Sequence, residues 1–483
     1  MARKSEAVGS ATGSVEDTGY LEHEFERWLA PFLDALSNKK QRKWAPVYMR
    51  GLLGPGERKS VEPMAGRIAP DDGEQLHHFL CTSGWDPAPL ERMLAEKAQQ
   101  MVGGSDAVLI VDDTTLLKQG HHSVGVARQY SGAAGKRANC QTLVSLTLAQ
   151  DEVPVCVGLK LFLPREWIDD TKRLDKAGVP EDEEHRAYQT KMEIALREID
   201  RVRSAGIVFG MVLADAGYGM SAEFRRALSD CGLTWAVGIS RIQRVYPTDV
   251  EVHMPRVKPG ARARKHPVPN REREPAEDVL AKKRWRSITW RTGTKGPLTA
   301  RFAATRVVVA DGVADALNHH LPGEEAWLVG ELRASGERKY YLANHPSTTT
   351  LRTLAAAIKA RWSCEQAHQQ MKEELGLDHF EGRSWTGLHH HALMTMISFA
   401  FLQHLRLTEV RGRGENRRVS QSHSLRTQVH SRGTTTTTDA ACDSTHADQH
   451  ATRPIRSLAT TQRAAMSEMP RTAELPAACV NLT

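Results

Sequence analysis

Short apolar runs and amphipathic stretches alternate through the middle of the chain, from residue 104 to residue 244. The runs AVLIVDD, CQTLVSLTLAQ, VPVCVGLKLFLP, IVFGMVLAD and LTWAVGI are continuously apolar, which is typical of strands covered on both faces. Two intervening segments repeat apolar residues every three or four positions and end at Gly206 and Gly232, so they predict helices. The predicted order is three strands, a helix, a strand, a helix and a strand, which indicates an α/β domain.

The flanking segments have different patterns. Residues 1–103 contain successive amphipathic helical stretches, which predict a small all-α domain. Residues 245–343 begin with a Pro- and Arg-rich stretch and continue as β-branched runs with glycine-containing turns, so this block is predicted to be mostly β. Residues 344–410 return to helical spacing. Residues 411–483 have few large apolar residues and a run of five threonines, and we expect them to be disordered.

Composition narrows the class of protein without identifying a partner. The 483 residues include 65 Lys and Arg against 58 Asp and Glu, so the formal net charge is +7, which is compatible with a polyanion. The seven cysteines form no C-x-x-C pair, so neither a disulfide framework nor a zinc ribbon is indicated. The first residues lack the apolar core of a signal peptide, and no apolar run reaches the ~18 residues of a membrane span. We therefore expect a cytoplasmic protein without membrane association.

Two of the predicted strands end in acidic residues. Asp112 and Asp113 end the first strand, and Asp215 ends the fourth. If these strands are parallel neighbours, their carboxyl ends converge on one crevice. Carboxylates so close repel each other unless a divalent cation such as Mg²⁺ lies between them. Turn or cap residues are the alternative explanation for acids at such positions.

The helix predicted after residue 350 carries a polar stripe where a core helix would have leucines. The stripe consists of Arg361, Glu365, His368 and Lys372, whose offsets of four, seven and eleven place them within roughly 60° of one another. A solvated face with helix-spaced ion pairs is the ordinary explanation. Alternatively, Glu365 completes a two-metal site for phosphoryl displacement, while Arg361 and Lys372 hold the phosphate backbone.

A basic stretch interleaved with aromatic residues, NKKQRKWAPVYMRGLLG, lies in the N-terminal segment. Such a stretch suits contacts with DNA phosphates, although an ordinary solvated helix explains it equally well. The DNA-binding candidates within it are Lys39, Lys40, Arg42 and Lys43.

The succession VDDTT, NCQTLVSL, LADAGYG and RWSCEQAHQQMKEELGLDHFEGRSW resembles the DDE transposases of bacterial insertion sequences. It is most similar to the cut-and-paste branch whose last motif is Y-x-x-R-x-x-x-E-x-x-x-x-x-x-K. Arg361, Glu365 and Lys372 match this motif at its spacing, whereas Ile358 replaces its tyrosine. The resemblance extends from Glu22 to Leu407, and GVARQYSG and GKRANCQ extend it beyond the acids.

This resemblance implies a fold and an activity. The fold is an α/β, ribonuclease H-like catalytic domain, interrupted by the β-rich insertion and preceded by the all-α domain. The activity is Mg²⁺-dependent cleavage at terminal inverted repeats and strand transfer into target DNA, with Mn²⁺ as a substitute ion. The implied partners are double-stranded DNA and a second copy of the chain, in the bacterial cytoplasm. Two alternatives stay open: an inactive or domesticated DNA-binding protein derived from a transposase, and another ribonuclease H-like nuclease.

The resemblance also implies the site residues. Asp113, Asp215 and Glu365 match the catalytic and metal-binding acids of the family. Asp113 is preferred to Asp112 because the family's acid directly precedes the threonine, and strand alternation allows only one of the two to point into the site. Arg361 and Lys372 are expected to contact DNA. His368 is expected either near the scissile phosphate or packed in the interior.

Overall fold

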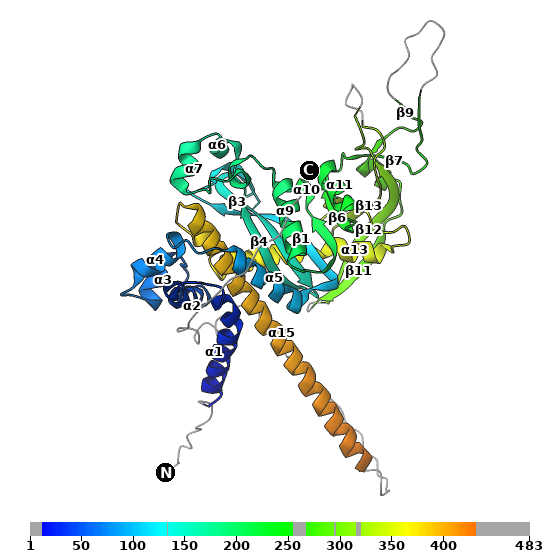
Figure 1. Cartoon of the computed structure of the whole chain (residues 1–483). Helices are drawn as coiled ribbons and strands as arrows, with labels where there is room; N and C mark the ends of the chain where they lie inside the picture. The colour runs from blue at the N-terminus through cyan, green and yellow to red at the C-terminus, as the bar shows by residue number, and fades with distance from the viewer. Residues whose placement is uncertain (1–11, 133, 255–266, 294–295, 315–319, 431–483) are drawn as a thin grey trace, which may run out of the picture. The chain divides into compact units, whose positions relative to one another are not determined.

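The computed structural model describes residues 12–132, 134–254, 267–293, 296–314 and 320–430 (Figure 1). The chain forms two compact units, each built from segments that are distant in sequence. Unit 1 comprises Met1–Trp85, Glu373–Phe380 and Met394–Thr483, and unit 2 comprises Asp86–Lys372 and Glu381–Leu393.

Unit 1 is helical in the part that the structure describes. It contains α1 (Thr12–Leu33), α2 (Lys39–Leu53), α3 (Val61–Ile68), α4 (Gly73–Cys81), the short 3-10 helix η1 (Leu377–His379) and most of α15 (Trp385–His430). Aromatic side chains join α1 to α15, since the ring centroid of Phe401 lies 5.1 Å from that of Phe25 and 5.9 Å from that of Trp28. This aromatic packing explains why amphipathic segments from both ends of the chain form one core.

Lys59 provides an unusual buried charge in unit 1. Its side chain is 2% exposed, and its ammonium donates to the carbonyls of Gly51 at 3.4 Å, of Leu52 at 2.9 Å and of Gly54. These carbonyls lie at the carboxyl end of α2, where the helix has no backbone donors left and the helix dipole is negative. Lys59 therefore caps α2 by charge and by hydrogen bonds.

Unit 2 is built on a twelve-stranded mixed sheet in the order β10-β7-β12-β13-β14-β6-β5-β1-β3-β2, with β11 beside β12 and β4 beside β3. The strands of this sheet are β1 (Gly104–Leu117), β2 (Ala127–Ser131), β3 (Lys136–Gln150), β4 (Val153–Leu161), β5 (Phe209–Ala214), β6 (Trp235–Ile239), β7 (Arg244–Tyr246), β10 (Glu274–Pro275), β11 (Arg286–Gly293), β12 (Gly296–Val309), β13 (Glu325–Leu332) and β14 (Arg338–Ala343). β8 (Val252–His253) and β9 (Val268–Pro269) pair separately. β1 and β5 are parallel neighbours, as the convergence of their acids requires.

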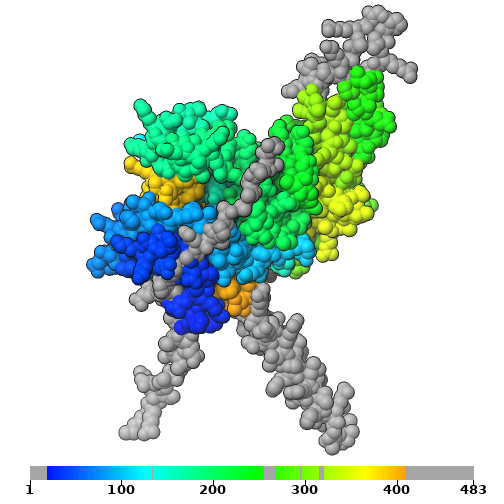
Figure 2. Space-filling view, in the orientation of Figure 1, coloured from blue at the N-terminus to red at the C-terminus, as the bar shows by residue number. Residues whose placement is uncertain are grey.

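The β-rich block predicted for residues 245–343 continues the central sheet. Its last strand, β14, pairs antiparallel with β6, so β12, β13 and β14 extend the sheet that carries the acidic strand ends. In Figure 2 the yellow-green residues of this block and the green residues around α10, α11 and β6 form one continuous surface. The paired backbone groups of β14 and β6 explain this continuity, because neither strand leaves an open edge between the two regions.

The helices of unit 2 cover the sheet. They are α5 (Ala88–Val102), α6 (Arg165–Ile168), α7 (Thr171–Ala177), α8 (Glu183–Arg186), α9 (Lys191–Ser204), α10 (Ala216–Gly219), α11 (Ala222–Asp230), α12 (Ala276–Ala281), α13 (Leu351–Ala360) and α14 (Trp362–Glu373). The segment predicted as one helix after residue 350 is divided at Arg361, the residue that follows α13 and precedes α14. α5 lies within the segment predicted to be all-α, residues 1–103, but it belongs to unit 2 because it packs on β4 and β3.

Alternation along β1 separates two faces of the sheet. Val108 and Ile110 belong to a core cluster with Leu354 and Ala355 of α13 and with Cys364 of α14. Successive strand residues point to opposite faces, so the even-numbered residues of this stretch face α13 and α14, and the odd-numbered ones face away.

The carboxyl-terminal region differs from the expectation of disorder in one part. α15 runs to His430, so residues 411–430 are helical, whereas residues 431–483 lie outside the described residues. Within the described ranges, no helix is long and apolar enough to cross a membrane.

Candidate active site

Asp112 occupies the face of β1 that α14 covers. It follows Val108 and Ile110 at two-residue intervals, and its backbone lies opposite Ser145 of β3. The side chain is 14% exposed and forms an ion pair with the guanidinium of Arg361. Asp112 therefore faces the helix on which the sequence placed the third acid.

Asp215 reaches the same region from β5. Ile110 of β1 lies opposite Leu213 of β5, so Asp215, two residues later, shares the face of Asp112. Its side-chain oxygen accepts hydrogen bonds from the backbone N–H groups of Gly217 at 2.8 Å and Tyr218 at 3.3 Å. Asp215 thus caps α10 with one oxygen, which holds the carboxylate at the strand end.

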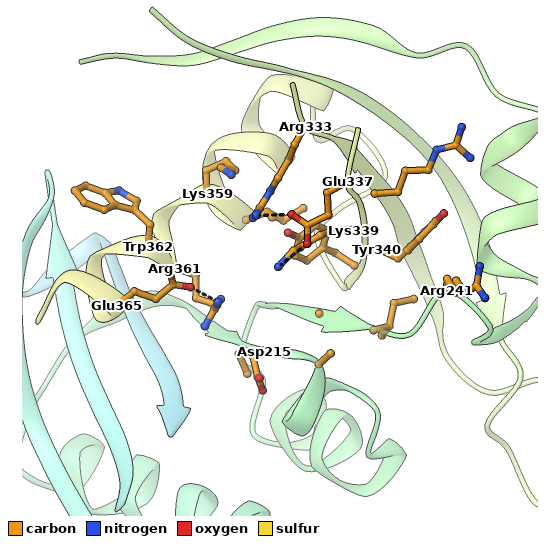
Figure 3. Close-up of a pocket in the computed structure, with 17 residues that line it drawn as sticks. Asp215, Arg241, Arg333, Glu337, Lys339, Tyr340, Lys359, Arg361, Trp362 and Glu365 are labelled. Atoms are coloured by element: carbon orange, nitrogen blue, oxygen red, sulfur yellow. Dashed lines mark hydrogen bonds and ion pairs between the residues drawn. The ribbon is translucent and has the colours of Figure 1, made fainter. Parts of the chain in front are cut away.

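Arg361 joins two of the acids. Its guanidinium pairs with Asp112 and also with Glu365, one helical turn along α14. Figure 3 shows the guanidinium between Glu365 and Asp215, and Glu365 itself is 61% exposed. Carboxylates of β1 and α14 therefore pair with one cationic side chain, and Asp215, which follows β5, lies close enough to influence its charge.

Asp113, the acid preferred from the sequence, lies on the opposite face of β1. Its carboxylate pairs with Lys191, the first residue of α9, and accepts a hydrogen bond of 2.6 Å from the hydroxyl of Tyr218. Burial and the nearby carboxylate of Asp113 raise the pKa of Tyr218 well above its ordinary value, so the phenol stays protonated and donates. Lys191 and Tyr218 were not singled out from the sequence, although Tyr218 stands within the motif LADAGYG.

The acids influence each other electrostatically. Burial raises the pKa of Asp112 to about 6, with Arg361 opposing the shift and Asp215 adding to it. Burial disfavours the charge on Arg361, but Asp112, Glu365 and Asp215 together raise the pKa of its guanidinium. Each carboxylate is therefore close enough to Arg361 to affect its charge, which a scattered set of surface acids would not do.

The two remaining residues of the stripe are held differently. The ring nitrogen Nε2 of His368 lies 2.8 Å from Oγ of Ser145 and 3.5 Å from Sγ of Cys364, and His368 is 8% exposed. Burial lowers its pKa to about 3, so the ring is neutral near pH 7, which favours packing over a charged contact with phosphate. Lys372 donates from Nζ to the backbone carbonyl of Thr115 at 3.0 Å.

A divalent ion fits the chemistry of this donor set. Within the described ranges no three His, Cys, Asp or Glu side chains are already gathered as a metal centre. However, Asp112 and Glu365 share a cationic partner in Arg361, with Asp215 close by, and hard cations prefer carboxylate oxygens of this kind.

A pocket of about 390 Å³ opens beside these acids (Figure 3). Asp215, Arg361 and Glu365 line it at one end, and residues of β14 and of the turn that precedes it line the other. The cationic side chains of the lining are Arg241, Arg333, Arg338, Lys339, Lys359 and Arg361. Glu337 offsets part of this charge by pairing with Arg333 at 2.9 Å and with Lys339 at 3.5 Å. The cations from the β-rich block were not foreseen, because only strand pairing brings them to this edge.

The four predicted DNA-binding residues of unit 1 lie in the first turns of α2. Lys39 and Lys40 are exposed, whereas Arg42 donates from Nε to the carbonyl of Leu36 at 3.2 Å. Lys43 pairs with Asp72 at 3.3 Å. Their role in DNA binding stays a prediction.

The fold and the site together define a mixed α/β protein with a centre of carboxylates beside a basic pocket. Comparison with known families makes the assignment specific, since the model for DDE superfamily endonucleases matches residues 31–297, more than half of the chain. The chain belongs to the DDE superfamily endonucleases, which confirms the family predicted from the motifs. Asp112, Asp113 and Asp215 lie within the matched range, and Glu365 lies beyond it.

Individual proteins match the chain over only part of its length. A probable transposase for insertion sequence element IS701 from Microchaete diplosiphon is 32% identical over 190 residues, which cover 39% of this chain and 46% of the relative. The chain thus matches less than half of that relative's length. Among solved structures, the piggyBac transposase synaptic complex with hairpin DNA matches with 8% identity and a TM-score of 0.38, over 76% of this chain and 66% of that one. A similarity this distant adds no argument about the function.

Proposed function

We propose that the protein is a transposase that cleaves DNA at the ends of an insertion sequence and transfers the strand into target DNA. The observation that carries this proposal is the meeting of Asp112, Asp215 and Glu365 around Arg361. These acids come from two neighbouring strands and one covering helix, which is the arrangement expected of a ribonuclease H-like catalytic domain with an insertion before its last acidic helix. The membership of the DDE superfamily endonucleases supports the same reaction class.

Asp112, Asp215 and Glu365 would hold Mg²⁺, or Mn²⁺ in its place. When bound, the ion supplies Lewis-acid stabilisation of the phosphate and activates the attacking oxygen. The sequence motif favours Asp113 as the metal ligand of β1. Asp112 is supported instead by its position on the face of β1 that α14 covers. We propose that Asp113 positions the site through Lys191 and Tyr218, which tie α9 and α10 to β1.

The chain's own cations would hold the DNA. Arg361 pairs with two acids, and its planar guanidinium suits bidentate contact with a phosphate. The pocket cations on β14 and on the turn before it would lie along the backbone that flanks the scissile phosphate, while Lys39 and Lys40 of α2 offer exposed charges for the terminal repeat. We further propose that two copies of the chain hold the two ends of the element, and that the protein acts in the bacterial cytoplasm, where its DNA substrate lies.

The proposal is tested with a labelled duplex that carries the terminal repeat of the element. Cleavage by the purified full chain is followed with Mg²⁺, with Mn²⁺ and with EDTA. We expect Asp215→Asn and Glu365→Gln to abolish nicking while the folded protein still binds the duplex. Nicking by Asp215→Asn at the rate of the unmodified protein would sink the assignment.

A pair of variants separates the two adjacent acids. Asp112→Asn and Asp113→Asn differ only in the face of β1 that loses a charge, so each is the control of the other. We expect Asp112→Asn to weaken Mn²⁺ binding measured by calorimetry, and Asp113→Asn to retain it. The reverse order would assign the ligand to Asp113, as the sequence motif indicates. DNA binding without nicking in the unmodified protein would favour the alternative of an inactive, transposase-derived DNA-binding protein.

A further inference from the structure

The hairpin of β2 and β3 carries a motif that the proposed active site does not use. This motif, GVARQYSGAAGKRANCQ, lies in a stretch from Thr114 to Gln150 that contains no Asp or Glu. The Lys and Arg residues of the same stretch are Lys118, Arg128, Lys136 and Arg137. The stretch itself therefore carries a net positive charge.

The strand pairing gathers an aromatic ring and two guanidinium groups on one face of the hairpin. Tyr130 of β2 lies directly opposite Arg137 of β3, and Arg128 lies opposite Asn139. Directly opposed residues of an antiparallel pair project to the same face with Cβ atoms about 4.5–5.5 Å apart. Tyr130, Arg128 and Arg137 are all exposed, with Tyr130 at 67%. A single exposed tyrosine is ordinary, but one that shares a face with two arginines in an acid-free hairpin indicates a ligand with both aromatic and anionic groups, and the guanidinium of Arg137 donates to the carbonyl of Arg128 at 2.9 Å.

The register relates this face to the active site. Asp112 of β1 lies opposite Ser145 of β3, and counting back from Ser145 by twos along β3 reaches Asn139 and then Arg137. Arg137 and its partner Tyr130 therefore point to the same face of the sheet as Asp112.

The other face of the hairpin confirms this alternation. The hydroxyl of Ser131, the residue after Tyr130, lies 2.8 Å from that of Thr115, which shares the face of Asp113. β2 also sits at the end of the strand order, next to β3 and two strands from β1. The exposed hairpin face thus belongs to the same face of the sheet as Asp112, beyond the buried residues Leu143 and Gln141 of β3.

We propose that Arg128, Tyr130 and Arg137 form a docking surface for unpaired DNA at the edge of the sheet that carries the active-site acids. Tyr130 stacks on a base, and the two guanidinium groups bind the phosphates on either side of it. Aromatic rings on a sheet surface, flanked by cations, bind single strands in this way because every base offers a π-face. The proposal rests on the proposed function, since DNA is the substrate that would pass from the acids to this face.

The test measures DNA binding without cleavage. Fluorescence anisotropy of the full chain in EDTA compares a blunt duplex with the same duplex bearing about ten unpaired nucleotides at one 3′ end, a length within the site size of single-strand binders. The test variants are Tyr130→Ala and the double change Arg128→Gln with Arg137→Gln. The matched control is Arg203→Gln with Arg226→Gln, which removes the same charge from exposed positions of α9 and α11.

The expected results differ between the variants. Tyr130→Ala weakens binding of the overhang duplex by about tenfold or more, because one stacked base is lost. It changes the affinity for the blunt duplex by less than about twofold, because that duplex offers no unpaired base to the ring. The double arginine change also lowers the salt dependence, by about 1.4 in the slope of log K against log salt for two phosphate contacts on a single strand. The control double variant retains the preference for the overhang.

Two kinds of failure are distinguishable. If the unmodified chain binds neither duplex, the proposed function fails. If it binds the overhang duplex and Tyr130→Ala binds it equally well, with unchanged thermal melting, the hairpin surface is overturned and the proposed function stands. An equal loss on both duplexes after Tyr130→Ala also overturns the stacking role.

Discussion

Replacement of Lys160 by methionine should strongly destabilise unit 2. Lys160 of β4 donates from Nζ to Glu91 of α5 at 2.8 Å and lies 4.0 Å from the carboxylate of Glu198 on α9. Arg201 of α9 completes the group, at 2.7 Å from Glu198 and 3.7 Å from Glu91. Two carboxylates and two cations are thus balanced where α5 and α9 pack against β4.

The magnitude follows from the uncompensated charge. Glu198 is 3% exposed and Glu91 10%, so Lys160→Met leaves two largely buried carboxylates facing one guanidinium. Breaking one partner of a buried ion pair costs about 3–5 kcal/mol, and we take about 3 kcal/mol because Lys160 is itself 24% exposed and partly screened by water. Although burial alone would raise it, Lys160 and Arg201 lower the pKa of Glu91. The stabilisation is therefore fully present above the ordinary pKa of Glu91 and is lost as the pH falls through its lowered value.

A double-mutant cycle provides the control. Glu91→Gln alone leaves two cations facing one carboxylate and should also destabilise unit 2. Lys160→Met combined with Glu91→Gln leaves one cation and one carboxylate, so the charges balance again. Urea unfolding at pH 7 should show the double variant at least about 2 kcal/mol more stable than the sum of the single changes predicts. A cost below about 1 kcal/mol for Lys160→Met, or simple additivity in the cycle, would refute the reasoning.

Two further predictions concern other buried groups. Lys59→Met removes the cap of α2 and should lower the free energy of unfolding of unit 1 by about 1–3 kcal/mol, measured by urea titration. The control is Lys40→Met, which changes an exposed residue of the same helix. Equal free energies of unfolding for the two variants would contradict the capping role. Burial lowers the pKa of His389 to about 3, so the unfolded chain takes up a proton below its ordinary pKa of 6.5 and the folded chain does not. Stability is therefore fully present above pH 6.5 and falls with decreasing pH, and His389→Gln should reduce the loss between pH 6.5 and 5 by about 2 kcal/mol. If the free energy of unfolding falls in parallel with pH for the unmodified protein and for His389→Gln, then His389 takes up protons in the folded chain.

Much of the architecture was predictable because apolar periodicity is a local property. The continuous apolar runs predicted the central strands β1, β3, β4, β5 and β6, and the change of texture near residue 245 predicted the β-rich block. The motifs led to the correct family. The parallel pairing of β1 with β5 brings Asp215 beside the acidic end of β1, as the predicted α/β arrangement requires.

The sequence by itself determined the set of acids, the family and the polar stripe of Arg361, Glu365, His368 and Lys372. It also determined that Asp112 and Asp113 point to opposite faces, since alternation is a property of any strand. Only the tertiary structure decided which of those faces α13 and α14 cover, because this depends on long-range packing of Leu354 and Cys364 against β1 and its neighbours. The same packing buried His368, and the pairing of β14 with β6 brought cations from the β-rich block beside Asp215. Local spacing sets the direction in which a side chain points, and the assembled sheet and helices decide what it meets there.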